Sequence, residues 1–109
     1  MVIKQNENIS RSIRFSLEEE GVEVARAFLY LIKNDLHAEP YGLLEDVFVQ
    51  GEFQGQGYGS KLVKEVIETA QTEGCYKLIC TSRLKKIKVH ALYERLGFDK
   101  HGLEFRMDF

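Results

Sequence analysis

Hydrophobic and polar residues alternate along the N-terminal part of the chain. From Ile9 to Leu17 the apolar side chains mostly fall on one side, a period of two that predicts a half-buried strand. After a glutamate-rich turn ending at Gly21, residues Val22 to Ile32 alternate at first and then become apolar on both sides. This predicts a hairpin partner at the centre of a sheet, although a helix also fits so short an apolar run. Tyr41 to Gln50 is the third predicted strand.

The spacing of apolar residues becomes helical after the third strand. Tyr58 to Glu73 is predicted as an amphipathic helix, with Gly74 as its natural C-terminal stop. Its apolar positions are Leu62, Val63, Val66, Ile67 and Ala70. Tyr76 to Thr81 then reads as a fourth strand, rich in residues that favour extended backbone.

The C-terminal part predicts a second helix and two more strands. The helix spans about Lys86 to Leu96 and ends at Gly97, and a closing hairpin is expected over residues 98–101 and 103–109, around Gly102. The predicted order is therefore β-β-β-α-β-α-β-β, an α/β (α+β) fold in a single domain over residues 1–109. Residues 1–8 are polar and are expected to be frayed.

Composition narrows the class of protein. The chain has 109 residues, 44% of them apolar and 29% charged, enough for one domain with a modest core. A net charge of −2 gives no reason to expect nucleic acid or a membrane as partner. No apolar run is long enough to span a bilayer and no signal peptide is evident, so a cytoplasmic protein is the expectation. Cys75 and Cys80 are expected as free thiols, and no metal site is predicted.

Three alternating glycines mark the junction between the third strand and the first helix. Gly55, Gly57 and Gly59 tolerate positive φ and allow close approach to the backbone, and a helix start exposes unpaired N–H groups. Strand, glycine loop and helix start together predict an anion cradle, most often for phosphate. The spacing matches neither the nucleoside triphosphate loop nor the dinucleotide fingerprint. A flexible turn without a ligand is the alternative.

Two motifs in this order resemble the GNAT family of N-acetyltransferases. The first is Gln54-x-x-Gly57-x-Gly59, which is similar to the family's Gln/Arg-x-x-Gly-x-Gly/Ala loop; the second is Tyr93-x-x-x-Gly97-Phe98. The resemblance covers residues from about 9 to the C-terminus. It implies a GNAT-like mixed, mostly antiparallel sheet and acetyl-coenzyme A as co-substrate, with the pyrophosphate held by backbone N–H groups and the pantetheine arm lying along the third strand.

Carried over position by position, the resemblance implies the following cofactor-binding residues. They are Val47, Phe48 and Val49 on the strand, Gln54, Gly55, Gln56, Gly57, Tyr58, Gly59 and Ser60 in the loop and helix start, and Lys86 before the second helix. Many family members have asparagine where this chain has Lys86. A solvated basic face is the alternative for the run that contains it.

Acyl transfer from a thioester needs a base for the amine and an acid for the leaving thiolate. The resemblance implies that Tyr93 protonates the departing sulfur; a core tyrosine is the alternative. It also implies that Glu45 acts as base near the acceptor amine, often through water. In a regular strand Glu45 shares a face with Leu43, Val47 and Val49, and a bulge would change that face. A charged strand residue in water is the alternative for Glu45.

One departure from the family concerns the acceptor side. Most members have another strand and one or two helices before the hairpin that begins here at Ile9. The expected function is direct acetyl transfer to the amine of a small molecule or protein. A catalytically silent coenzyme A-binding or regulatory module, or an interaction domain without cofactor, is the alternative. A homodimer is expected, because the first strand is an open edge and the second is apolar on both faces. Protection of that edge by Arg11 and Arg14 is the alternative.

Overall fold

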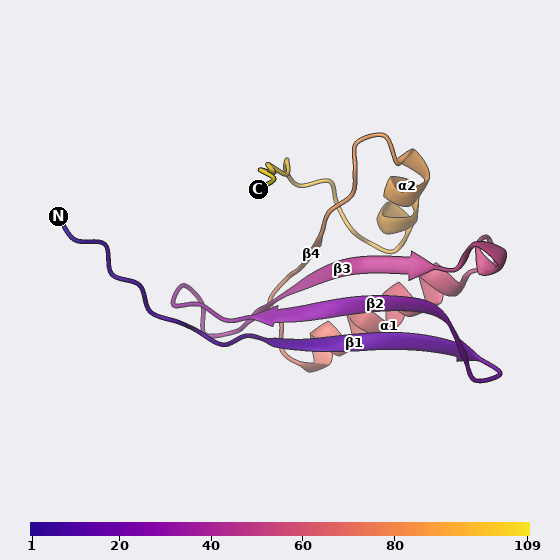
Figure 1. Ribbon diagram of the computed structural model, residues 1–109, viewed down its shortest axis with the longest axis horizontal. Helices are drawn as coiled ribbons and strands as arrows, with labels where there is room; N and C mark the ends of the chain where they lie inside the picture. Colours follow the sequence, from indigo (N-terminus) through magenta and orange to yellow (C-terminus); the bar gives the residue numbers. More distant parts are fainter.

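A computed structural model describes all residues, 1–109, and shows one sheet with a helix behind it (Figure 1). The strands lie in the order β1-β2-β3-β4, antiparallel except for the parallel pair β3 and β4. The elements are β1 (Arg11–Glu19), β2 (Val22–Ile32), β3 (Tyr41–Val49), the 3-10 turn η1 (Gly51–Phe53), α1 (Tyr58–Thr72), β4 (Leu78–Cys80) and α2 (Ile87–Arg95). The mixed, mostly antiparallel α/β architecture is confirmed.

The hairpin of β1 and β2 turns at Glu20 and Gly21. Both residues have positive φ, 51° and 79°, the conformation of a two-residue type I′ turn whose twist matches that of the strands it joins. Glu19 therefore pairs directly with Val22. Along β1, Ile13, Phe15 and Leu17 pack against the core, as the alternation predicts.

The core lies between the sheet and α1. Leu29 and Leu44 of the sheet and Val63 and Val66 of α1 are each at most 2% exposed. The other members of this buried cluster are Ala25, Ala27, Leu31, Leu62 and Ala70. Helix α1 covers one face of the sheet, and in Figure 1 no helix lies over the opposite face, which we call the open face.

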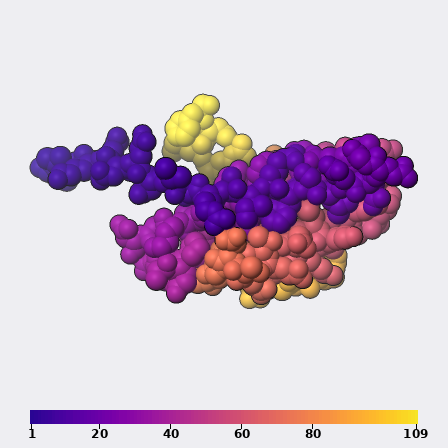
Figure 2. Space-filling view, turned by 90° about the horizontal axis from the view of Figure 1, so that it is seen from below, coloured from indigo at the N-terminus to yellow at the C-terminus, as the bar shows by residue number.

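Residues 1–10 belong to no helix or strand. They extend from the start of β1 away from the sheet and lengthen the molecule to 55 Å, against 30 and 29 Å along the other two axes (Figure 2). No helix of the chain has both the length and the apolar composition that crossing a bilayer requires.

The prediction of a closing hairpin is wrong. Residues 96–109 contain no strand, and Leu103, Phe105, Met107 and Phe109 are all exposed. Their alternation with charged residues is a local signal, but a strand also needs a partner edge, and an isolated hairpin is at best marginally stable. The neighbouring strand β4 is shorter than predicted, with only Leu78–Cys80 in the ladder.

Candidate active site

The glycine loop has the backbone conformation that its sequence requires. Gly55 and Gly57 have φ of 78° and 84°, and Gly57 is the N-cap of α1. Its carbonyl oxygen accepts the N–H of Lys61 at 3.0 Å. The backbone N–H groups from Gly55 to Ser60 find no acceptor within the chain. Six successive free donors at the positive end of a helix dipole are suited to bind an anion.

The glutamines of the motif bind backbone groups of the chain itself. The side-chain amide of Gln54 donates to the carbonyl oxygen of Val49 at 3.0 Å, and that of Gln56 donates to the carbonyl oxygen of Glu52 at 3.2 Å. Gln54 thus ties the loop to the end of β3. The N–H groups, rather than these side chains, are left for a ligand.

Tyr58 joins the loop to a distant part of the sheet. Its hydroxyl donates to Oε1 of Glu19 at 3.1 Å, and this hydrogen bond raises the pKa of Tyr58. The ring meets Phe53 edge-on, with the centroids 6.0 Å apart. Sequence reasoning missed Glu19 and Phe53, because no motif links the end of the first hairpin to the glycine loop.

Beyond Leu44 the strands β3 and β4 diverge. They pair at Gly42–Leu78, Leu43–Ile79 and Leu44–Cys80, after which β4 ends and β3 continues to Val49. The edge of β3 that faces away from β2 therefore has no strand beside it from Glu45 to Val49. Extended backbone groups on such an edge can bind an extended ligand.

A β-bulge at Asp46 divides β3 into two halves. Phe28 pairs with Glu45 and Arg26 with Phe48, so Asp46 and Val47 together lie opposite one residue of β2, and Asp46 has φ of 54°. Glu45 therefore does not share a face with Val47 and Val49, which corrects the regular-strand expectation. Val47 and Val49 pack against the core, whereas Glu45 lies on the open face with Phe28. The physical reason is that one inserted residue reverses the alternation of side chains.

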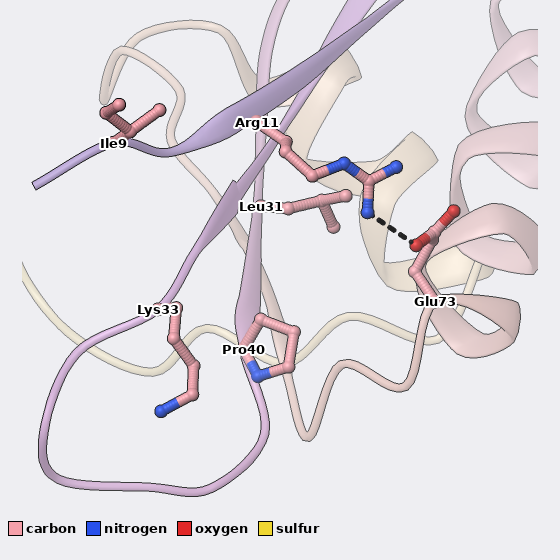
Figure 3. A pocket seen from close by; sticks show the side chains of 6 residues that line it. All are labelled: Ile9, Arg11, Leu31, Lys33, Pro40 and Glu73. Atoms are coloured by element: carbon pink, nitrogen blue, oxygen red, sulfur yellow. Dashed lines mark hydrogen bonds and ion pairs between the residues drawn. The ribbon is translucent and has the colours of Figure 1, made fainter.

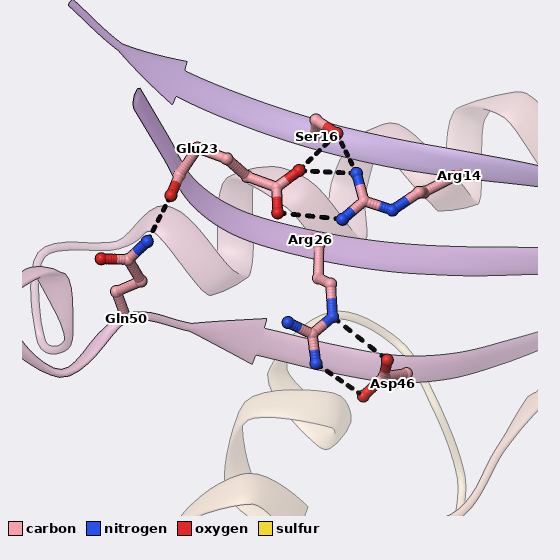
Figure 4. Close-up of polar contacts among 6 residues, drawn as sticks. All are labelled: Arg14, Ser16, Glu23, Arg26, Asp46 and Gln50. Atoms are coloured by element: carbon pink, nitrogen blue, oxygen red, sulfur yellow. Dashed lines mark hydrogen bonds and ion pairs between the residues drawn. The ribbon is translucent and has the colours of Figure 1, made fainter. Parts of the chain in front are cut away.

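Two pairs of charged side chains lie on the open face (Figure 4). Arg26 donates to both carboxylate oxygens of Asp46, at 3.1 and 3.3 Å, and its guanidinium lies over the ring of Phe48, 4.7 Å from the centroid. Arg14 makes a two-point contact with Glu23 that lowers the pKa of Glu23 to about 2. The exposed carboxylate of Glu45 makes no ion pair or hydrogen bond within the chain.

Tyr93, on α2, is half-buried and packs against the core cluster. Burial, followed by the influence of Cys80 and Glu45, raises the pKa of Tyr93 to about 12. The hydroxyl of Tyr93 makes no hydrogen bond to a protein group and is not sealed from solvent. The phenol therefore keeps its proton across the ordinary pH range and is available as a donor. The fold thus brings Tyr93 within electrostatic range of Glu45.

The other candidate residues, near α2 and on β4, make few contacts with the loop or the divergent edge. Lys86 is the N-cap residue of α2, is exposed, and makes no side-chain contact that would direct it toward the loop. Nearby, His90 Nε2–H donates to the carbonyl oxygen of Arg83 at 2.8 Å. Burial raises the pKa of the Cys80 thiol to about 11, so it stays protonated and is a poor nucleophile. Both cysteines are free and half-buried, as predicted.

A pocket of about 190 Å³ lies elsewhere, at the C-terminal end of α1 (Figure 3). Arg11 and Glu73 close one side of it with an ion pair of 3.0 Å. Helix α1 is 15 residues long, so this pocket is about 22 Å from the glycine loop along the helix axis. It is separate from the candidate active site.

Comparison with known proteins identifies the class. The model of the acetyltransferase (GNAT) family matches residues 2–98, and the chain belongs to this family. The solved acetyltransferase of Trypanosoma brucei is 30% identical, with a TM-score of 0.76 over 92% of this chain and 69% of that one. The glucosamine-6-phosphate N-acetyltransferase of Arabidopsis thaliana is 26% identical, with a TM-score of 0.82 over 90% and 67%.

Curated relatives show which acceptors occur among similar proteins. Glucosamine 6-phosphate N-acetyltransferase of Trypanosoma brucei brucei is 37% identical over 62% of this chain and 44% of its own length. Aminoglycoside N(6')-acetyltransferase type 1 of Stenotrophomonas maltophilia is 33% identical over the same shares. Thialysine N-epsilon-acetyltransferase of Bos taurus is 41% identical over 50% and 32%. The chain thus spans less than half the length of these curated relatives.

Proposed function

We propose that this chain binds acetyl-coenzyme A and transfers its acetyl group directly to a primary amine. The observation that carries the proposal is the row of free N–H groups from Gly55 to Ser60, adjoining the unpaired edge of β3. The free N–H groups are suited to bind a pyrophosphate, and the unpaired edge of β3 is suited to bind an extended pantetheine arm. Family membership supports the same assignment.

The cofactor contacts follow from this placement. Gly55, Gly57 and Gly59 supply backbone donors, and the peptide groups of Val47, Phe48 and Val49 lie along the unpaired edge. The side chains of Val47 and Val49 serve the core, so their contribution is through the backbone. Gln54 holds the loop to β3, and Lys86 stays a prediction as a phosphate contact.

The chemistry rests on Tyr93 and Glu45. With both substrates bound together, proximity provides much of the acceleration and no covalent enzyme intermediate is needed. Glu45 accepts a proton from the acceptor ammonium, directly or through water. The neutral amine attacks the thioester carbon, the C–S bond breaks, and the Tyr93 hydroxyl gives its proton to the leaving thiolate. The second proton of the attacking nitrogen then passes through water to the Tyr93 phenolate, which leaves a neutral amide and restores the phenol. The protonation state of Tyr93 supports this role.

The acceptor is proposed only as an amine. The curated relatives are named for a sugar amine, an aminoglycoside and a lysine analogue, and these three compounds form a rational first panel. Release of free thiol from acetyl-coenzyme A should rise with at least one of them. Binding of coenzyme A without turnover on any amine would instead favour a silent coenzyme A-binding module. The cytoplasmic location expected from the sequence stays a prediction.

A homodimer is proposed as the working form. Strand β1 is an edge of the sheet, and the open face carries Tyr30 and Phe48, which are 36% and 45% exposed. A two-fold contact with a second copy would cover such a surface. The same contact would add a wall beside Glu45, where the acceptor amine is proposed to bind.

A further inference from the structure

We infer that the contact between Tyr58 and Glu19 is a lock that pre-organises the glycine loop for pyrophosphate. The inference rests on the proposed function, and it assigns to Tyr58 and Glu19 a positioning role that the family motif does not contain. The loop residues 54–57 lie between two anchored points, Phe53 in η1 and Tyr58 at the start of α1.

The loop needs such a lock because of its composition. Two of its four residues are glycines with positive φ, and a third glycine follows at position 59. Glycine loses more conformational freedom on ordering than any other residue, so a free loop would have to be ordered by the ligand. Restricting the loop beforehand lowers the cost of binding, since apparent affinity falls in proportion to the population of the competent conformation.

The contacts hold the loop from separate parts of the fold. The Tyr58 hydroxyl reaches Glu19 on β1 at 3.1 Å, and its ring stands edge-on to Phe53. On the other side, the Gln54 amide holds the carbonyl oxygen of Val49. The start of α1, whose N–H groups form half of the cradle, is thus tied to the first hairpin, while the other end of the loop is tied to the end of β3.

Charge makes the inference testable, because two effects of Glu19 have opposite signs. Glu19 is a carboxylate close to a proposed anion site, and by charge alone its removal should strengthen binding of an anion. Glu19 is also the hydrogen-bond acceptor of the lock, so by that effect its removal should weaken binding of the anion. Glu19→Ala removes both the charge and the acceptor, whereas Glu19→Gln removes the charge and keeps an acceptor for the Tyr58 hydroxyl.

The experiment compares coenzyme A with pantetheine, which has no pyrophosphate, by isothermal titration. The readout is the ratio of the two dissociation constants. Tyr58→Phe keeps the ring contact with Phe53, and it should reduce the advantage of coenzyme A by about three- to ten-fold. Glu19→Ala should reduce it similarly, Glu19→Gln should leave it equal or larger, and the double variant Tyr58→Phe/Glu19→Ala should be no worse than either single variant.

Controls separate this inference from the proposed function. Glu18→Ala removes a neighbouring carboxylate that makes no contact with Tyr58, and thermal unfolding of each free variant shows whether the fold is intact. If the unaltered chain gives coenzyme A no advantage over pantetheine, the proposed pyrophosphate cradle fails. If that advantage is present and survives in both Tyr58→Phe and Glu19→Ala, or if Glu19→Ala strengthens binding, the lock is wrong.

Discussion

Phe98 donates its backbone N–H to the carbonyl oxygen of Tyr93 at 3.0 Å, and the centroids of their rings are 5.5 Å apart. Between them, Gly97 has φ of 103° and donates to the carbonyl oxygen of Glu94 at 3.1 Å. These bonds form a Schellman motif with its apolar contact. The Tyr-x-x-x-Gly-Phe signature therefore has a structural reason: it ends α2 and fixes the ring of the proposed acid.

Replacement of that acid should affect turnover rather than binding. Tyr93→Phe keeps the ring against Phe98 and removes the hydroxyl, so kcat should fall by about 10²-fold while the affinity for coenzyme A stays nearly constant. Steady-state kinetics and titration calorimetry measure the two quantities. Tyr76→Phe, at an exposed tyrosine in the segment before β4, is the matched control. Equal kcat for Tyr93→Phe and the unaltered chain at every pH would refute the acid role.

The proposed base should reveal itself in the pH dependence of the rate. Glu45→Gln should lower the rate by at least about ten-fold, and most strongly at lower pH, where an unassisted amine loses its proton least readily. The measurement is a pH–rate profile with a saturating amine. Glu68→Gln, on the outer side of α1, controls for loss of one surface carboxylate. A profile identical in shape and height to that of the unaltered chain would show that Glu45 is not the base and is only a charged surface residue.

Gly57 should tolerate no side chain. At φ of 84° an L-residue is strained even though the space around its Cβ position is open, so Gly57→Val should distort the cradle and abolish measurable binding of coenzyme A. Gly51→Ala is the control, because Gly51 also has open space but no positive φ. Thermal shift with added coenzyme A reports the result. A ligand-induced shift in Gly57→Val as large as in the control would contradict the prediction.

The Arg14–Glu23 pair on the open face should make the stability of the fold depend on pH in the acid range. The pKa of Glu23 is lowered from 4.5 to about 2, chiefly by its hydrogen bond to Arg14. The carboxylate therefore contributes its stabilisation fully above pH 4.5, and the contribution is lost as pH falls from 4.5 to 2. Glu23→Gln should lower the Tm by a few degrees at most at pH 7, since the pair is exposed. The Tm difference should vanish near pH 2; a constant difference from pH 7 to pH 2 would disprove the linkage.

The oligomeric state can be measured directly. Light scattering coupled to size exclusion should give about twice the chain mass of 12.6 kDa at micromolar concentration. Tyr30→Glu, which places a charge on the open face, should shift the protein toward the monomer. Leu84→Glu, at a residue that is 85% exposed in the segment before α2, should not. A monomer with full acetyl-transfer activity would argue against the dimer.

Local patterns in the sequence determined most elements of this fold and the proposed cradle. The alternation from Ile9 to Ile32, the helical spacing after Tyr58 and the glycine stops at Gly74 and Gly97 each express a preference of nearby backbone. The loop from Gln54 to Ser60 was predictable for the same reason. A helix start following a glycine loop exposes free donors whatever the rest of the chain does.

Tertiary structure decided what depends on partners distant in the chain. The bulge at Asp46 placed Val47 and Val49 on the face opposite to Glu45, because the pairing of β3 with β2 sets the alternation of side chains. The absent C-terminal strands and the short β4 depend on which edges are available for pairing. The hydrogen bond from Tyr58 to Glu19 exists only because the first hairpin ends beside the start of α1. Hydrogen bonds and strand pairing are short-ranged in space but not in sequence, so no local pattern predicts them.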